Sequence, residues 1–215
     1  MLLSALEFGS LLTYVPQPTN DEQRKAKDFT VFLKGDKVIT SPSPQSITTH
    51  VAKFIAKNIA SLPFGNYFGS DVALVPVPSS SLRNPGSLWV PYNLAKALEA
   101  ENLGQLIECV KRKIAIAKAA TAKSEERPTP KQHYESLEII PTNATMKKIV
   151  LIDDVITRGA TAIGVASRLK EVYPDADIKH FAVVRTISKP ENFVKFNQPC
   201  IGKITIRDGQ PHRNP

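Results

Sequence analysis

Cysteine is scarce in this chain of 215 residues, which contains only Cys109 and Cys200. They form no CxxC pair, so a zinc ribbon is excluded and a disulfide framework is not expected. The sequence also lacks any run of about 18 apolar residues, which argues against a membrane-spanning helix. The apolar first fifteen residues show neither a basic start nor a small-residue cleavage site, so the expected compartment is the cytoplasm.

Charge of one sign is in excess, since the formal net charge is +8. Such an excess is typical of a nucleic-acid-binding surface or of a pocket for a polyanionic small molecule. Few aromatic residues lie among the basic ones, so a platform that stacks single-stranded bases is poorly supported. A solvated basic loop is the third interpretation, because seven basic residues gather within residues 110–131: Lys111, Arg112, Lys113, Lys118, Lys123, Arg127 and Lys131.

Hydrophobic residues make up 42% of the chain, enough for an ordinary globular core. The first 45 residues look irregular, apart from a hairpin predicted over residues 28–39 around Gly35-Asp36. Apolar periodicity predicts helices at residues 47–60, 92–101 and 160–173. Short apolar runs predict strands at residues 72–77, 106–110, 148–152, 178–184 and 203–207. Strands that alternate with helices indicate an α/β fold with a parallel sheet.

The most informative segment is IVLIDDVITRGAT, residues 149–161. Its first four residues read as a central strand buried on both faces. Asp153 and Asp154 follow at the carboxyl end of that strand, where open α/β sheets bind ligands. Two adjacent carboxylates repel each other and resist burial. A site that faces vicinal hydroxyls or a divalent cation relieves this conflict.

The second half of the segment leads directly into a predicted helix. Gly159 permits a tight turn and a close backbone approach. The first N–H groups of a helix have no internal partner, and with the helix dipole they form an anion site. The hydroxyls of Thr157 and Thr161 add donors. Acids for sugar hydroxyls therefore precede donors for a phosphate, which is the arrangement that a ribose 5-phosphate requires.

This segment resembles the signature with which type I phosphoribosyltransferases bind 5-phosphoribosyl-1-pyrophosphate (PRPP). The resemblance implies that Asp153 and Asp154 hold the ribose 2- and 3-hydroxyls, act as the catalytic pair, and hold Mg²⁺ through water or through those hydroxyls. It also implies that the 5-phosphate binds to Thr157, Arg158, Gly159, Ala160 and Thr161. Arg158 replaces the commoner second threonine of the family and adds a cation beside the phosphate.

Two upstream segments extend the resemblance. VPVPSS, residues 75–80, is similar to the VPVP segment of ComF-like proteins in the same superfamily, and the resemblance implies that Pro78, Ser79 and Ser80 meet the pyrophosphate. The basic loop corresponds to the mobile loop that closes over the pyrophosphate, with Arg112, Lys113 and Lys118 as candidate ligands. The cysteine-rich zinc element of many ComF-like proteins is absent, so a role in DNA uptake is not carried over.

The resemblance implies a type I phosphoribosyltransferase-like α/β fold, with a central mostly parallel sheet flanked by helices and a hood from both terminal segments. Residues 1–65 would contribute to the hood or to flanking helices, residues 66–190 would form the core, and residues 191–215 would be an extension. The implied activity is transfer of the phosphoribosyl group to an unidentified nucleobase-like acceptor in nucleotide metabolism, in a homodimer by analogy. The alternatives are a PRPP- or nucleotide-sensing regulator that binds nucleic acid, and a defence or toxin effector.

Overall fold

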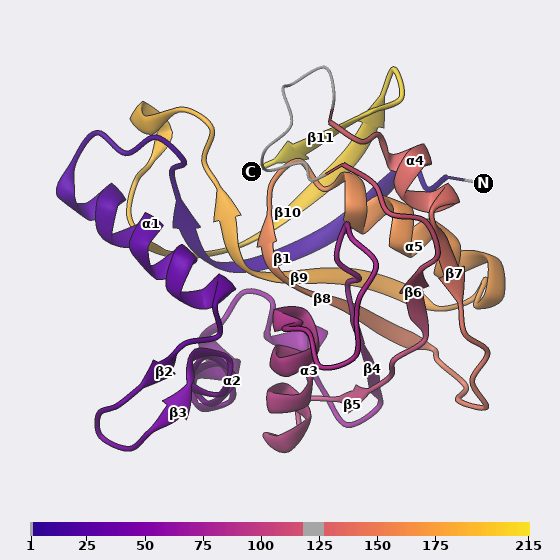
Figure 1. Ribbon diagram of the computed structural model, residues 1–215, viewed down its shortest axis with the longest axis horizontal. Coiled ribbons are helices and arrows are strands. Elements are labelled where there is room, and N and C mark those ends of the chain that lie inside the picture. The colour runs from indigo at the N-terminus through magenta and orange to yellow at the C-terminus, as the bar shows by residue number, and fades with distance from the viewer. Residues whose placement is uncertain (1, 118–126) are drawn as a thin grey trace.

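The computed structural model describes residues 2–117 and 127–215. A seven-stranded sheet in the order β11-β10-β1-β9-β8-β4-β5 crosses the molecule (Figure 1). Strands β5, β4, β8, β9 and β1 are parallel to their neighbours, and β10 and β11 extend the β1 edge in antiparallel pairing. The strands are β1 (Ala5–Tyr14), β4 (Val72–Pro76), β5 (Gln105–Leu106), β8 (Lys148–Ile156), β9 (Asp177–Thr186), β10 (Asn197–Arg207) and β11 (Gln210–Asn214).

Helices cover both faces of this sheet, and each face has its own hydrophobic core (Figure 1). One face packs against α1 (Asp21–Lys34), α2 (Ile47–Asn58) and α3 (Val90–Ala100). The other packs against α5 (Ala160–Val172), which in turn contacts α4 (Pro130–Glu135). The predicted α/β class, with a mostly parallel sheet flanked by helices, is therefore confirmed.

Strand β8 is the central element that positions the candidate site. Ile149 and Leu151 pack on the α5 side, while Val150 and Ile152 pack on the α2 and α3 side, which explains the uninterrupted apolar run. Its neighbour β4 pairs with it only as far as Ile152. The strand continues beside β9 to Ile156, so the two acids lie within its second half instead of following its end.

The structure of the N-terminal 45 residues differs most from the sequence-based prediction. They are not irregular, because β1 is an interior strand of the sheet. The hairpin predicted over residues 28–39 is wrong, since α1 runs through Lys34 and ends at Gly35. Asn20 caps the start of this helix by accepting a hydrogen bond from the Gln23 amide, 2.9 Å away. The Gly-Asp pair that suggested a hairpin turn marks the end of a helix.

Most other predicted elements agree with the structure to within a few residues, although β10 begins at Asn197 instead of residue 203 and β11 was not predicted. One exception is the strand expected over residues 106–110, which is two short strands. Of these, β5 joins the main sheet, whereas β6 (Val110–Arg112) pairs with β7 (Leu137–Ile139) in a separate ribbon. A second ribbon joins β2 (Val38–Ile39) to β3 (Gln45–Ser46). Short 3₁₀ helices lie at Ile59–Ser61, Gly65–Tyr67 and Pro190–Asn192.

The two terminal segments both contribute to the sheet. The first 65 residues supply β1 as well as the flanking helices α1 and α2, and residues 191–215 supply β10 and β11. Whether these segments also form a hood stays a prediction. No helix within the described part of the chain is both long and apolar enough to cross a membrane.

Candidate functional site

A small cavity of about 40 Å³ lies where β8 ends and α5 begins. One buried water needs roughly 10–15 Å³ of such space, so the cavity has room for a few waters or a small oxyanion. The cavity brings Asp153 together with all five predicted phosphate-loop residues. Its walls are Pro128, His133, Asp153, Val155, Ile156, Thr157, Arg158, Gly159, Ala160, Thr161, Ala162 and His180.

The turn between β8 and α5 has the geometry of an anion site. Gly159 has φ = 88°, a left-handed conformation that favours glycine. A Cβ atom at this position would lie 2.6 Å from Cδ1 of Ile204 on β10, so the packing also requires glycine. No side chain caps α5. Its first backbone N–H groups therefore have no acceptor within the helix and are available to an anion.

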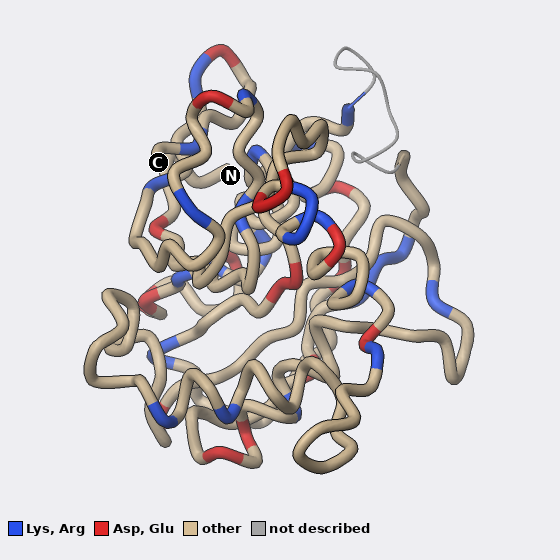
Figure 2. The backbone as a smooth tube through the Cα atoms, turned by 90° about the vertical axis from the view of Figure 1, so that its left-hand side faces the viewer, with Lys and Arg blue, Asp and Glu red and all other residues tan. Residues whose placement is uncertain are grey.

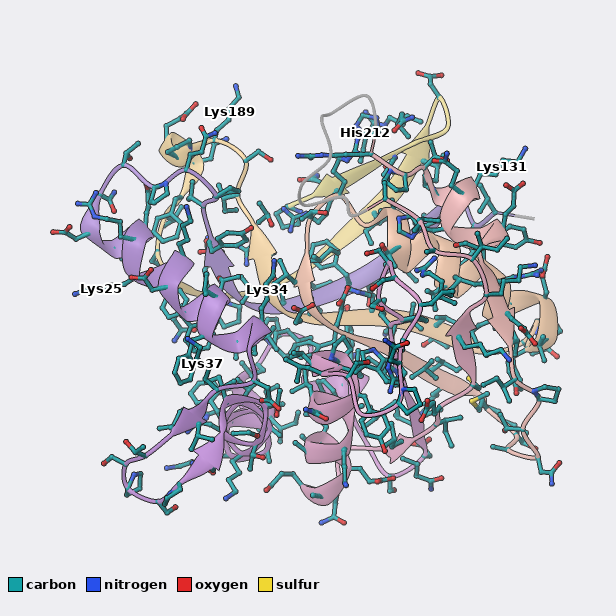
Figure 3. The ribbon with its side chains drawn as sticks, in the orientation of Figure 1. Lys25, Lys34, Lys37, Lys131, Lys189 and His212 are labelled. Carbon is teal, nitrogen blue, oxygen red and sulfur yellow. The ribbon has the colours of Figure 1, made fainter. Side chains whose placement is uncertain are left out.

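The two acids are largely withdrawn from water. The side chain of Asp153 is 17% exposed, and its Oδ1 accepts a hydrogen bond from the Asp154 amide at 2.9 Å. Burial raises the pKa of both carboxyls above 3.8, and the charge of Asp153 raises the pKa of Asp154 further. Lys34 opposes both shifts. It stands at the end of α1 that lies nearest to the middle of the sheet (Figure 3).

His180 on β9 is a site residue that the sequence interpretation missed. Its ring is fully buried, and Nε2 lies 3.6 Å from Oδ2 of Asp153. Burial lowers the pKa of His180 to about 3, so the ring is neutral at ordinary pH. Neither ring nitrogen has a hydrogen-bond partner among the described residues. Nothing in the sequence around His180 signals this role, because the contact arises only from the pairing of β8 with β9.

His133 on α4 forms another wall of the cavity. His133 lies in a basic stretch of the sequence, yet its side chain is only 2% exposed. Its Nε2 lies 3.3 Å from the hydroxyl of Thr161. Burial, followed by the charge of Arg112, lowers the pKa of His133 to about 3. His133 therefore acts as a neutral neighbour that orients Thr161.

On one side of the cavity the Asp153 carboxyl can accept hydrogen bonds, and on the other side the amides that open α5 can donate them. Buried carboxylates that lack a bound cation are stabilised by hydrogen bonds from sugar hydroxyls or by the charge of a divalent ion. The described residues contain no cluster of three or more His, Cys, Asp or Glu side chains that could hold a metal by itself. Mg²⁺ commonly binds to one or two carboxylates and completes its shell with water and substrate phosphates, so Asp153 and Asp154 fit this ion.

The residues predicted to meet pyrophosphate lie around a second cavity. Pro78 and Ser79 follow β4 and line a cavity of about 340 Å³ together with Arg112. Ser80 is not among its walls, and its carbonyl oxygen accepts a hydrogen bond from the Ile116 amide at 2.9 Å. The Val77 amide donates to the carbonyl oxygen of Ile152 at 2.9 Å. This loop therefore leaves the sheet directly beside the strand that carries the acids, although the two cavities are separate.

The three basic candidates differ in their surroundings. Arg112 is 8% exposed; its Nε donates to the Ser79 carbonyl oxygen at 2.5 Å and its Nη1 to the Ser136 hydroxyl. Burial lowers the pKa of Arg112 to about 10. Lys113 is exposed, and Lys118 lies outside the described residues. Arg112 therefore holds the Ser79 loop against the end of α4. It also lines the cavity beside Ser79, and its contact with pyrophosphate stays a prediction.

Neither a family model nor a curated protein matches this chain. Among solved structures, a hypoxanthine phosphoribosyltransferase from Staphylococcus aureus is 12% identical over 66% of this chain and 73% of its own, with a TM-score of 0.35. A glutamine mutant of an invariant aspartic acid in HPRTs is 13% identical over 66% of this chain and 75% of its own, with a TM-score of 0.34. TM-scores this low assign neither a family nor a function to the chain.

Proposed function

We propose that this protein binds PRPP with Mg²⁺ and transfers the phosphoribosyl group to a nucleobase-like acceptor, releasing pyrophosphate. The observation that carries the proposal is the single cavity that Asp153 shares with residues 157–161. Acceptors for sugar hydroxyls and donors for a phosphate meet there, at the carboxyl edge of a parallel sheet. The resemblance of residues 149–161 to the PRPP signature supports the same assignment.

The chain itself supplies binding and orientation. Asp153 and Asp154 accept hydrogen bonds from the ribose hydroxyls, and the amides that open α5 hold the 5-phosphate with the hydroxyls of Thr157 and Thr161. Fixing the sugar at both ends aligns C1 for attack. The acceptor nitrogen forms a bond to C1 as the bond from C1 to the pyrophosphate oxygen breaks, and pyrophosphate leaves with that electron pair. The proton of the acceptor nitrogen goes to solvent.

Asp153 and Asp154 would hold Mg²⁺, through water or through the ribose hydroxyls. When bound, it supplies positive charge to the phosphate oxygens of the leaving group. His133 contacts the Thr161 hydroxyl at 3.3 Å, and His180 lies 3.6 Å from Asp153. Both rings are buried, and burial lowers their pKa values. Arg158 adds a cation at the phosphate end of the cavity.

The proposal includes a cytoplasmic location and, by analogy with the superfamily, a homodimer. The rival interpretation is a regulator that senses PRPP and binds nucleic acid. The net charge of +8 is compatible with it, although Lys and Arg positions are spread along the whole chain trace with Asp and Glu between them (Figure 2). Both interpretations use the acids and the phosphate loop, so turnover of PRPP is what separates them.

The test is an assay of pyrophosphate release from PRPP and Mg²⁺ in the presence of individual nucleobases. We expect release with at least one base and none with the Asp153→Asn/Asp154→Asn variant. Retention of RNA or DNA, with PRPP bound but no turnover on any base, would favour the regulator. Failure of the wild-type protein to bind PRPP at all would refute both interpretations.

A further inference from the structure

A second group of cations lies beside the phosphate loop, at the ends of β9 and β11. Arg185 is 3% exposed, and its Nη1 donates to the Gln198 carbonyl oxygen at 2.6 Å and to the Ser10 hydroxyl at 3.3 Å. Arg213 on β11 donates through Nη2 to the Thr186 carbonyl oxygen. The strand order joins these two arginines, which lie far apart in the sequence, because β1 and β10 bridge β9 to β11.

The hydrogen bonds of this group are incomplete. Nε of Arg185, Nη1 of Arg213 and the hydroxyl of Thr186 are buried and have no partner among the described residues. Within the same residues, neither arginine forms an ion pair with a carboxylate, although ion pairs occur elsewhere. Arg213 also lies over the Phe8 ring, with Cζ 5.5 Å from the ring centroid. Two neighbouring guanidinium groups that are withdrawn from water still repel each other, and an anion would supply the missing counter-charge.

A cavity of about 480 Å³ opens next to this group. It shares Thr157 and Arg158 with the smaller cavity of the candidate site. Arg207, His212 and Arg213 come from the hairpin of β10 and β11, and His212 stands on β11 in Figure 3. Asp208 is the one acid among the described lining residues, against three arginines. The cavity is therefore positively charged, and the forked guanidinium groups match the geometry of a phosphate.

We propose that this cavity is a second phosphate-binding site, lined by Arg158, Arg207 and Arg213. Its position relative to the first phosphate rests on the proposed function of residues 157–161, whereas its affinity for phosphate rests on the arginines alone. The phosphate is either the next group of the same ligand, as in a ribose 5-phosphate that continues into a pyrophosphate, or free inorganic phosphate. In the first case the protein accepts ligands larger than a sugar monophosphate.

The test is calorimetry with three probes, namely ribose 5-phosphate, ADP-ribose and inorganic phosphate. The variant is Arg207→Gln, because Arg207 is exposed and its loss should not disturb folding. If the second phosphate belongs to the same ligand, ADP-ribose binds the wild type more tightly than ribose 5-phosphate does, and the variant loses about 10- to 100-fold of ADP-ribose affinity. If the phosphate is free, inorganic phosphate occupies two sites in the wild type and one in the variant.

The matched control is Lys203→Gln, which removes an exposed positive charge from the same strand outside the cavity and should bind all three probes as the wild type does. The proposal is overturned if Arg207→Gln binds ADP-ribose and inorganic phosphate like the wild type. The Asp153→Asn/Asp154→Asn variant separates the two proposals. Unchanged ribose 5-phosphate binding in that variant would contradict the proposed function, while the effect of Arg207→Gln on inorganic phosphate would still decide the second site.

Discussion

Two neighbouring strands of the sheet end with opposite charges. Strand β8 carries Asp153 and Asp154, whereas β9 carries Arg185, which pairs in register with Ile156. Burial raises the pKa of both acids and lowers the pKa of Arg185. An ion pair between acid and guanidinium would shift these pKa values in the opposite directions. The two charges are therefore both desolvated and yet not paired with each other.

This difference leaves two kinds of polar group at the sheet edge available to the ligand that we propose. Acids that remain unpaired can accept hydrogen bonds from hydroxyls or bind a cation, and arginines that remain unpaired can bind phosphate. Mutual pairing would remove both capacities. The fold keeps the charges separate by placing the phosphate loop, with Gly159 packed against Ile204, between β8 and the hairpin of β10 and β11.

The largest expected effect comes from the acidic side of the comparison. Asp153→Asn/Asp154→Asn removes two charged acceptors, each worth about 1.5–3 kcal/mol in a hydrogen bond. Affinity for Mg-PRPP should therefore fall by about 100-fold or more, while circular dichroism stays unchanged. Isothermal titration calorimetry measures the loss.

The matched control for this variant is Asp175→Asn. Asp175 is exposed and lies in the connection that enters β9, at the end of the strand opposite the site. The substitution removes one carboxylate that lies outside the cavity, so the affinity for Mg-PRPP should be retained. Equal affinity in the wild type and the double variant would show that the acids do not bind the ligand.

The next effect tests the loop that separates the two charged regions. Gly159→Ala forces a side chain into a left-handed conformation, at a cost of about 1–2 kcal/mol, and brings Cβ to 2.6 Å from Ile204. Overpacking adds about 1–3 kcal/mol, so the free energy of unfolding should fall by about 2–4 kcal/mol in urea denaturation. Gly209→Ala is the control, since Gly209 has φ = 71° and open space around it. Equal losses in both variants would mean that the contact with Ile204 is unimportant.

A smaller effect separates structural from ligand-binding cations. Arg112→Lys loses the fork that joins Ser79 to Ser136, so stability should fall by about 1.5–3 kcal/mol. Lys113→Gln changes an exposed neighbour and should alter stability by less than about 0.5 kcal/mol. Denaturation of both variants checks this. If Arg112→Lys kept its stability but lost PRPP affinity, Arg112 would bind the ligand, as the sequence predicts, and would have no structural role.

The last effect is a pH dependence of stability. The folded-state pKa values of Asp153 and Asp154 are raised above 3.8, so the folded protein binds more protons than the unfolded chain. Their contribution is fully present below pH 3.8 and is lost as the pH rises through the raised values, at no more than about 1.4 kcal/mol per pH unit for each group. The double Asn variant should lack this decline. Parallel pH profiles for the two proteins would contradict the assigned shifts.

The core of the fold was predictable because its signals are local. The apolar run of β8 and the periodic residues of α5 lie next to each other in the sequence, so the acids and the phosphate turn could be placed from residues 149–161 alone. Strand β1 was missed because ten residues that are mostly buried on both faces show no alternation. Helix α1 was missed because the Gly35-Asp36 pair suits a hairpin turn as well as a helix end.

The walls of the site were not predictable, since they depend on contacts between distant segments. His180 reaches Asp153 only through the pairing of β9 with β8. Arg185 and Arg213 meet only because the last strand of the chain returns to the β1 edge of the sheet. The sequence therefore predicts candidate binding residues that are close together in the chain. Which other charged residues surround them is determined by the tertiary fold.

The most direct test of the central claim is a crystal structure with ribose 5-phosphate bound. We expect the phosphate within hydrogen-bonding distance of the amides of residues 157–161, and the sugar hydroxyls directed toward Asp153 and Asp154. A ligand bound elsewhere on the chain, or a phosphate seated at the loop with its hydroxyls turned away from both acids, would contradict the account.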